Sequence, residues 1–206
     1  MITMMKKHGV VLAVFCGLAT ALTSSVYFLT KERIAEQAEM QLQRVFDQLI
    51  PTALYDNEMQ KDCYIVTNPA LGNDLPHRLY VGRKGGEPSV LAIETTAPDG
   101  YSGPIQLLVA ANMQGYVYGV QVLEHKETPG LGDKIERRVS NWIERFTGLT
   151  LTSADDTRWA VKKDGGEFDQ FTGATITPRA VVNSVKHTVL YLQSTDFSEL
   201  PRCEVK

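Results

Sequence analysis

The chain has 206 residues, of which 43% are apolar and 22% are charged, and this composition excludes the fibrous and disordered classes. Its formal net charge of −3 is unevenly distributed: residues 1–33 carry +3, so the remainder carries −6. An acidic domain without a basic stripe excludes nucleic-acid binding, which depends on Lys and Arg side chains that meet phosphates.

The N-terminal region contains a run of 22 uncharged residues from Gly9 to Thr30. About 20 apolar residues cross the hydrocarbon core, so the run predicts a transmembrane helix over 9–30 behind a cytoplasmic tail over 1–8. A cleavable signal peptide that ends near Ala21 is the alternative. The apolar character returns at 26–29, which favours a retained anchor. Basic residues flank both ends, but either interpretation places the rest of the chain outside the cytoplasm.

The next segment, over 31–50, has apolar residues at helical spacing and predicts a connecting amphipathic helix that stops at Pro51. Short β-rich runs separated by Gly and Pro turns follow, and they predict strands. These strands are expected over Tyr64–Thr67, Arg78–Gly82, Ser89–Thr96, Ile105–Ala111 and Val117–Glu124.

Helical patterns come later in the chain. Asp133 to Phe146 predicts a helix, Trp159 to Val161 a further strand, and Thr177 and Pro178 suit the N-cap and first position of a last helix. Strands followed by helices indicate an α+β fold with an antiparallel sheet, here a single domain over 51–206.

Three cysteines are present, and their spacing matches no zinc or iron–sulfur pattern. Cys16 lies in the apolar run. Cys63 and Cys203 lie in the globular part, where they would form either one long-loop disulfide or two unpaired thiols. The sequence leaves these two alternatives open.

Three segments have unusual local sequences: GYSGP at 100–104, EHKETPGLGD at 124–133 and DQFTGATITP at 169–178. Each alone is consistent with an ordinary turn, the third with a threonine helix cap. The third segment also leads into a helix N-terminus, where free N–H groups and the helix dipole attract anions. The hydroxyl of Thr175 is expected near that positive end.

Taken in this order, the three segments resemble the FMN-binding domain family of membrane redox complexes. The G subunits of Rnf electron-transport complexes form one branch, and the C subunit of the sodium-translocating NADH:quinone reductase is a sister. The resemblance implies FMN esterified through its phosphate to Thr175, with Asp169 at the leading acidic position of the motif. It also implies a flavin transferase that installs the flavin from FAD with magnesium.

The resemblance further implies a bacterial inner-membrane complex that couples electron flow between NADH and ferredoxin to ion movement. The domain would lie in the periplasm beside other membrane subunits, and the isolated chain is expected to show no activity. An extracytoplasmic flavin reductase and a binding module without flavin are the alternatives.

No catalytic or metal-ligating residue is expected, and the anticipated site is a cofactor site. The expected cofactor-binding residues are Thr175, Thr172, Gly173, Ala174, Asp169, Gly100, Tyr101, Ser102, Gly103, His125, Thr128, Leu131 and Gly132. Backbone N–H groups of 100–103 and 128–132 are expected to contact the flavin. The candidates for a positive group near the ring are Lys126, Lys162 and Lys163.

Overall fold

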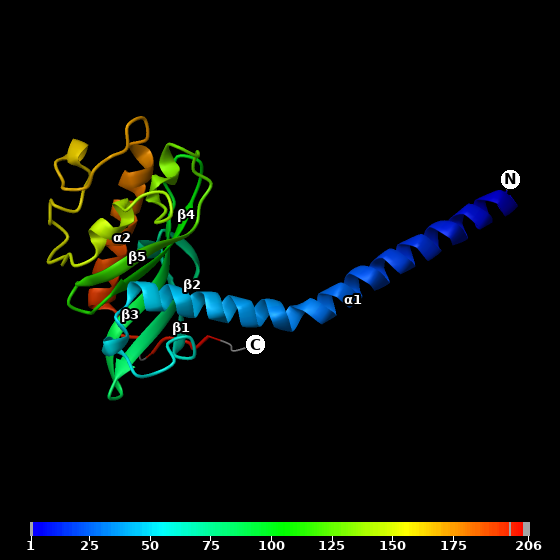
Figure 1. Cartoon of the computed structure of the whole chain (residues 1–206), viewed down its shortest axis with the longest axis horizontal. Coiled ribbons are helices and arrows are strands. Elements are labelled where there is room, and N and C mark those ends of the chain that lie inside the picture. Colours follow the sequence, from blue (N-terminus) through cyan, green and yellow to red (C-terminus); the bar gives the residue numbers. More distant parts are fainter. Residues whose placement is uncertain (1, 198, 204–206) are drawn as a thin grey trace. The chain divides into compact units, whose positions relative to one another are not determined.

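The computed structural model describes residues 2–197 and 199–203, apart from the side chains of residues 2–5, 7, 32, 35, 36 and 38. The chain divides into two compact units, Met1–Arg44 and Val45–Lys206. The first unit is entirely helical where it is described, and the second contains the sheet (Figure 1).

Helix α1 (Ile2–Leu49) supplies the first unit, and its stretch His8–Lys31 is long and apolar enough to cross a membrane. Large apolar side chains of this stretch are exposed, for example Phe15 at 68% and Phe28 at 74%. The hydroxyls of Thr20 and Ser25 donate to carbonyl oxygens one turn earlier, at 2.8 and 2.7 Å. Internal satisfaction of polar groups suits a helix surrounded by lipid.

The second unit is built on a five-stranded antiparallel sheet in which neighbours in sequence are neighbours in space (Figure 1). The strands are β1 (Cys63–Asn68), β2 (Asn73–Lys84), β3 (Glu87–Ala97), β4 (Ile105–Ala111) and β5 (Val117–Glu124). The turn between β2 and β3 places Gly85 and Gly86 at φ of 61° and 89°. Two left-handed residues are what a tight hairpin turn requires.

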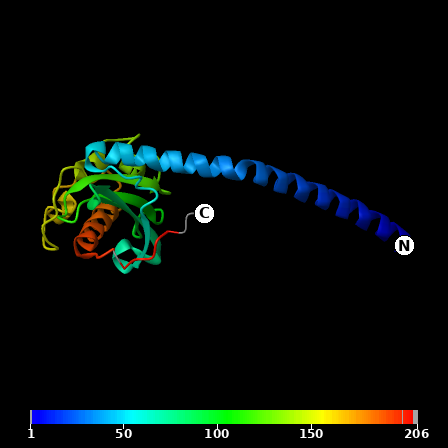
Figure 2. The ribbon, with the colours of Figure 1, turned by 90° about the horizontal axis from the view of Figure 1, so that it is seen from below.

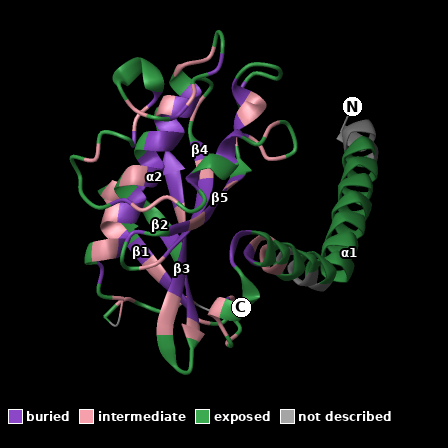
Figure 3. Ribbon diagram, turned by 60° about the vertical axis from the view of Figure 1, so that its left-hand side comes forward, coloured by how far each residue is buried: buried purple, intermediate pink, exposed green. Residues whose placement is uncertain are grey.

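Helix α2 (Ile176–Ser194) packs on one face of the sheet, mainly against β3 and β4. The core between them is apolar and almost wholly buried (Figure 3). The sheet contributes Leu79, Val81, Leu91, Ile93, Leu107, Val109 and Val120, and α2 contributes Val181, Val182, Val185, Val189 and Leu192.

The last turn of α1 belongs to the second unit and lies on the sheet face opposite α2 (Figure 2). Phe46 and Leu49 are buried there, and the rings of Phe46 and Tyr80 meet edge to face at a centroid distance of 5.2 Å. Leu49 packs on Gly119, where a Cβ atom would come within 2.8 Å of the leucine Cδ2. α1 ends before Pro51, the residue that the sequence predicts to stop it.

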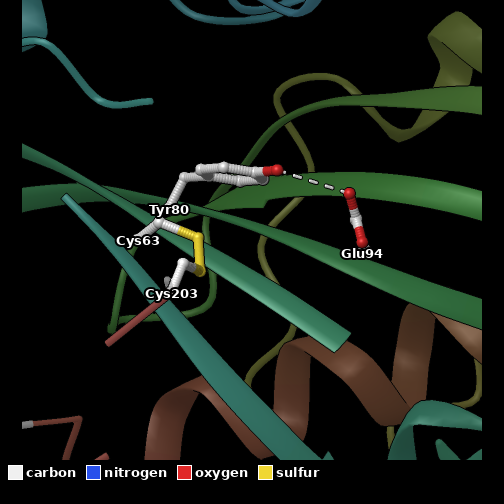
Figure 4. Close-up of a disulfide and its surroundings, with 4 residues drawn as sticks. All are labelled: Cys63, Tyr80, Glu94 and Cys203. Atoms are coloured by element: carbon white, nitrogen blue, oxygen red, sulfur yellow. Dashed lines mark hydrogen bonds between the residues drawn. A yellow bond between two sulfur atoms is a disulfide. The ribbon is translucent and has the colours of Figure 1, made fainter. Parts of the chain in front are cut away.

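The C-terminal segment lies along the free edge of β1. The Ile65 amide donates to the Pro201 carbonyl at 2.8 Å, and the Cys203 amide donates to the Cys63 carbonyl at 2.9 Å. A disulfide joins Cys63 and Cys203, whose Cα atoms are 5.3 Å apart (Figure 4). The structure therefore resolves the alternative left open by the sequence in favour of the disulfide, which fixes the segment to the sheet.

Beside the disulfide, Tyr80 is buried on β2, and burial raises its pKa to about 12 (Figure 4). Its hydroxyl donates to a carboxylate oxygen of Glu94 at 3.4 Å, and burial also raises the pKa of Glu94. This polar pair lies on the face of the sheet that receives Phe46.

Two predicted elements are wrong. Asp133–Phe146 is not one helix but two short 3₁₀ helices, η3 (Gly132–Ile135) and η4 (Trp142–Phe146). Between them the Ser140 hydroxyl donates a hydrogen bond to the Lys134 carbonyl at 2.6 Å and accepts one from the Trp142 amide at 3.2 Å. Such side-chain bonds compete with helix formation. The predicted strand at Trp159–Val161 is only an isolated bridge between Val161 and Phe168.

The remaining short elements are also 3₁₀ turns, and they connect the strands and loops. They are η1 (Thr52–Leu54), η2 (Pro69–Leu71) and η5 (Lys162–Asp164).

Candidate functional site

A small cavity lies where the first turn of α2 meets the loops after β3 and β5. Its volume is about 140 Å³. The lining residues are Tyr101, Glu127, Thr128, Leu131, Gly132, Gly173, Ala174, Thr175, Ile176 and Thr177. The three segments with unusual sequences therefore meet at this cavity, although up to about 75 residues separate them in the chain.

The wall formed by the third segment is a tight turn followed directly by a helix. The Ala174 amide donates to the Phe171 carbonyl at 3.0 Å, and Gly173 takes a φ of 81°, which a residue with a side chain rarely adopts. Thr175 is the N-cap residue of α2. The turn thus delivers Thr175 to the start of a 19-residue helix.

The Thr175 side chain does not cap the helix. Across the described residues, no hydrogen bond involves its hydroxyl, and the residue is half-buried in the cavity wall. The amides of Ile176 and Thr177 lie in the first turn and have no acceptor within the helix. An unpaired hydroxyl and free amides at a helix start form a site that favours a phosphate group.

The prediction that Thr177 caps this helix is wrong. The helix starts one residue earlier than Thr177, and the Thr177 side chain is fully buried. Its hydroxyl donates to Glu127 Oε2 at 2.5 Å instead of to the helix backbone. The Thr177 hydroxyl, which the local sequence pattern assigns to a helix cap, is instead bound to a carboxylate 50 residues away in the chain.

Glu127 is a site residue that sequence reasoning missed, together with Ile176 and Thr177. Its side chain is only 5% exposed although it lines the cavity. The only signal for it in the sequence is its position inside the segment 124–133, next to a Pro-Gly turn. A buried acid is rarely retained without donors to pair it.

His125 does not line the cavity but positions the loop that does. Its Nδ1 accepts the Glu127 amide at 2.9 Å, so its Nε2 carries the proton that is donated to Glu136 Oε1 at 2.5 Å. The Arg138 hydrogen bond, and to a lesser extent His125, lowers the pKa of Glu136. His125 therefore connects the loop after β5 to the segment that follows η3.

Asp169 likewise lies outside the cavity lining. Its carboxylate pairs with Arg145 at 2.5 Å and with Lys162, and the Lys162 hydrogen bond lowers its pKa. The Trp142 indole N–H donates to the Asp169 carbonyl at 2.7 Å. Asp169 thus fixes the start of the loop that carries Thr175, and Lys162 is occupied by this pairing rather than free to face a flavin.

The aromatic cluster under this loop gives it a rigid base. The rings of Trp142 and Phe171 meet edge to face at 5.3 Å, and Phe146 and Phe168 lie at 4.5 Å. Lys134 lies over the Phe171 ring at 5.9 Å. Lys126 and Lys163 are exposed and do not line the cavity.

In the GYSGP segment, only Tyr101 lines the cavity. Gly100 has no room for a side chain, because a Cβ atom would lie 2.2 Å from the Gly103 carbonyl oxygen. The Ser102 amide donates to Glu127 Oε1 at 3.0 Å, and the amides of Leu131 and Gly132 donate to the backbone carbonyl of Thr128. These amides, expected to contact the flavin, are already paired within the chain. Thr172 is exposed and also lies outside the lining.

The cavity fits a part of an FMN molecule rather than the whole. Its volume of about 140 Å³ is below the roughly 300–1,000 Å³ of pockets that enclose a drug-sized ligand. Three apolar or aromatic side chains line it while remaining exposed, Tyr101 at 69%, Leu131 at 43% and Ile176 at 45%. The helix start suits the phosphate, and these side chains suit an aromatic ring that extends outside.

Comparison with known families agrees with this geometry. A family model for an FMN-binding domain matches residues 100–189, which include every residue that lines the cavity. A second model, for the RnfG N-terminal region, matches residues 1–49. The fold and the site therefore define a flavoprotein class, an α+β FMN-binding domain preceded by an apolar N-terminal helix, and FMN is its cofactor.

Full-length relatives narrow this class to a family. The chain is 62% identical over 208 residues to the G subunit of the ion-translocating oxidoreductase complex of Photorhabdus laumondii, covering 100% of both chains. The proteins of the same name from Yersinia pestis and Escherichia coli K12 are 58% and 53% identical over 205 residues, covering at least 98% of each chain. The chain belongs to the G-subunit family of the Rnf ion-translocating oxidoreductase complexes, which confirms the resemblance.

Proposed function

We propose that this chain is a membrane-anchored electron carrier that holds one FMN covalently through a phosphoester to Thr175. The observation that carries the proposal is the Thr175 hydroxyl, unpaired among the described residues, in the cavity wall at the start of α2. A helix start stabilises the negative charge of a phosphodiester.

Neighbouring threonines are less suited to this attachment. Thr177 is fully buried, and its hydroxyl is donated to Glu127. Thr172 is exposed outside the cavity lining. Thr128 lines the cavity but belongs to the loop after β5 and not to the start of a helix. Thr175 alone combines an available hydroxyl with the positive end of a helix.

Attachment requires the transfer of an FMN group to Thr175, and we propose FAD as the donor. The Thr175 oxygen forms a bond to the phosphorus of the FMN half, and the pyrophosphate P–O bond breaks. AMP leaves with the electron pair, and the hydroxyl proton is released. A flavin transferase that uses magnesium is the partner we propose for this step, since magnesium neutralises charge on transferred phosphates.

The chain would serve a complex that couples electron transfer between NADH and ferredoxin to ion movement. It would do so as one link, because the residues that the structure describes provide no metal or iron–sulfur centre beside the flavin. Cys63 and Cys203 form the disulfide, and the third cysteine, Cys16, lies in the apolar helix. The described residues hold no cluster of three potential metal ligands. Electrons would therefore enter and leave through neighbouring subunits.

We also propose that the domain lies in the periplasm, with the helix retained in the bacterial inner membrane. The disulfide supports this location, because disulfides persist in oxidising compartments and are rare in the bacterial cytosol. The stretch His8–Lys31 would cross the membrane once. A retained segment predicts a mature protein that begins before residue 22.

The experiment is the Thr175→Ala substitution, with the full chain produced in cells that flavinylate the wild type. We expect wild-type intact mass to exceed the chain by one FMN less water, and the variant to show the mass of the bare chain with unchanged circular dichroism. Flavin fluorescence on a denaturing gel should disappear with it.

The matched control is Thr172→Ala, which removes an exposed hydroxyl three residues earlier and should leave the flavin in place. Flavin that persists in Thr175→Ala and disappears in Thr172→Ala would move the attachment to Thr172. A purified flavin-loaded chain that oxidises NADH at a useful rate by itself would contradict the carrier role and favour a flavin reductase.

A further inference from the structure

Glu127 connects the three walls of the cavity. Its side chain is 5% exposed, and it lies in the loop after β5, whereas its two bonding partners lie 25 and 50 residues away. Oε1 accepts the Ser102 amide at 3.0 Å, and Oε2 accepts the Thr177 hydroxyl at 2.5 Å. One carboxylate thus joins the turn after β3, the loop after β5 and the first turn of α2.

Two glycines make room for this carboxylate. A Cβ atom at Gly132 would lie 2.6 Å from Glu127 Oε2 and 2.9 Å from the Thr177 hydroxyl oxygen. A Cβ atom at Gly100 would lie 3.0 Å from Glu127 Oε1. The backbone is shaped around the acid from two sides, so its position is closely defined.

The backbone of Glu127 is fixed as well as its side chain. Its amide donates to His125 Nδ1 at 2.9 Å, and His125 Nε2 donates to Glu136 at 2.5 Å. The carboxylate consequently cannot turn away from the cavity without breaking both of its hydrogen bonds. Both of its oxygens receive donors, which is the arrangement of an ionised carboxylate.

We infer that Glu127 is a positioning residue for the flavin, and that its negative charge makes the bound flavin harder to reduce. This inference rests on the proposed attachment of FMN at Thr175. The positioning part follows from the bonds that align Tyr101, Leu131 and Thr175 around one cavity. Without Glu127, the Ser102 amide loses its acceptor, and the Thr177 hydroxyl loses its acceptor in a fully buried place.

The charge part follows from the small size of the cavity. The exposed side chains of Tyr101 and Leu131, which suit the flavin ring, line the same cavity of about 140 Å³ as Glu127, so a ring that packs on them lies a short distance from the carboxylate. Reduction adds negative charge to the flavin ring, and like charges repel more strongly away from bulk water. Glu127 therefore lowers the reduction potential, which suits a carrier that must give up its electrons.

The test compares Glu127→Gln and Glu127→Ala in the full chain, extracted from membranes of cells that flavinylate the wild type. Glutamine keeps an acceptor for the Ser102 amide, and its NH₂ can donate to the Thr177 oxygen, so it keeps the geometry and removes the charge. Alanine removes both. Intact mass measures flavin loading, and a spectroscopic redox titration measures the potential.

We expect Glu127→Gln to load flavin at the wild-type level and to show a potential shifted upward. Glu127→Ala should lose most of its covalent flavin, with several-fold lower loading. Glu124→Gln makes the same charge change three residues earlier at an exposed position and should alter neither measurement. Compared with Glu127→Ala, the Glu127→Gln variant should recover flavin loading, but its reduction potential should remain above that of the wild type. A merely structural role of Glu127 would not separate loading from potential in this way.

Two results would overturn the inference. A Glu127→Gln chain with the wild-type potential would remove the charge effect, and a Glu127→Ala chain with full loading would remove the positioning role. Thr177→Val provides a second loading test if Glu127→Ala fails to fold, because it deletes one donor at nearly constant shape; full loading in it would count against positioning. Absence of the FMN mass in the wild type would refute the proposed attachment instead.

Discussion

The sheet and the loops that frame the cavity are stabilised in different ways. Ile93 and Leu107 represent a sheet core that is fully buried and held by many apolar contacts. The loops depend on individual polar bonds, such as those of Glu127 and the Trp142 indole with the Asp169 carbonyl. A substitution in the sheet should therefore change stability, and one in the loops should mainly change the flavin.

The same contrast explains how so small a cavity can keep a defined shape. The loops contain 3₁₀ turns and irregular backbone, which contribute little stability by themselves. Their base is the aromatic cluster around Phe146, which belongs to the same core as the sheet. The polar bonds then select one arrangement of loops on a base that apolar packing already holds.

The largest effect on stability is expected for Ile93→Ala at the centre of β3. Ile93 is fully buried, and a truncation of this kind costs about 2–5 kcal/mol in the free energy of unfolding. Denaturant unfolding of the detergent-extracted chain, followed by tryptophan fluorescence, measures it. Flavin loading should remain normal at temperatures where the variant is folded. Val139→Ala, at a position 45% exposed, is the control and should cost less than about 0.5 kcal/mol. A loading defect in folded Ile93→Ala would break the contrast.

A smaller effect is expected from removal of the disulfide by the double substitution Cys63→Ser and Cys203→Ser. The bond closes a separation of 140 residues and fixes the C-terminal segment to β1, so its loss should cost about 2–4 kcal/mol. Thermal unfolding with and without reductant measures the loss, which should lower the wild type to the level of the variant. Cys16→Ser should change nothing in the domain. Equal midpoints for wild type and variant under oxidising conditions would show that the segment is held without the bond.

Apolar patterning predicts the sheet well and the loops poorly. β4 and β5 coincide with their predicted bounds because each is a mostly apolar run between turn residues. The stripe from Asp133 to Phe146 has helical spacing, but a similar spacing arises when two short turns each bury their apolar residues. The Ser140 hydroxyl, which breaks the helix, acts through bonds that a periodic pattern does not contain.

The candidate site shows the same division. Tyr101, Leu131, Gly132 and Thr175 line the cavity, and the sequence predicts them at one site because the three segments together resemble the FMN-binding domain family. Local turn patterns alone do not say that these distant segments meet. Glu127 was missed because its partners are 25 and 50 residues away. The partners of His125 and Asp169 are likewise set by tertiary structure, so a local pattern identifies the loop without assigning the role of each polar side chain.

The smallest expected effect is the pH dependence of the free energy of unfolding that His77 causes. It tests how a buried titratable side chain in the sheet affects stability. This side chain of β2 is 4% exposed, and burial lowers its pKa below the ordinary value of about 6.5, although a hydrogen bond with Asn73 opposes the shift. As the pH falls through 6.5, the unfolded chain binds a proton that the folded chain does not. The free energy of unfolding should therefore decrease with falling pH until the lowered pKa of the folded state is reached.

The measurement is the difference in unfolding free energy between wild type and His77→Gln from pH 8 to pH 5. Glu94 has a raised pKa, so its contribution has the opposite sign and is lost as the pH rises above about 4.5. Because both proteins contain Glu94, its contribution cancels in the difference, which should change only below about pH 6.5. Wild type should lose stability relative to the variant in that range, while flavin loading stays constant in both. If the difference in unfolding free energy does not change with pH, His77 accepts a proton in the folded sheet as easily as in the unfolded chain. The sheet would then tolerate a buried charge, which only the loops are expected to hold.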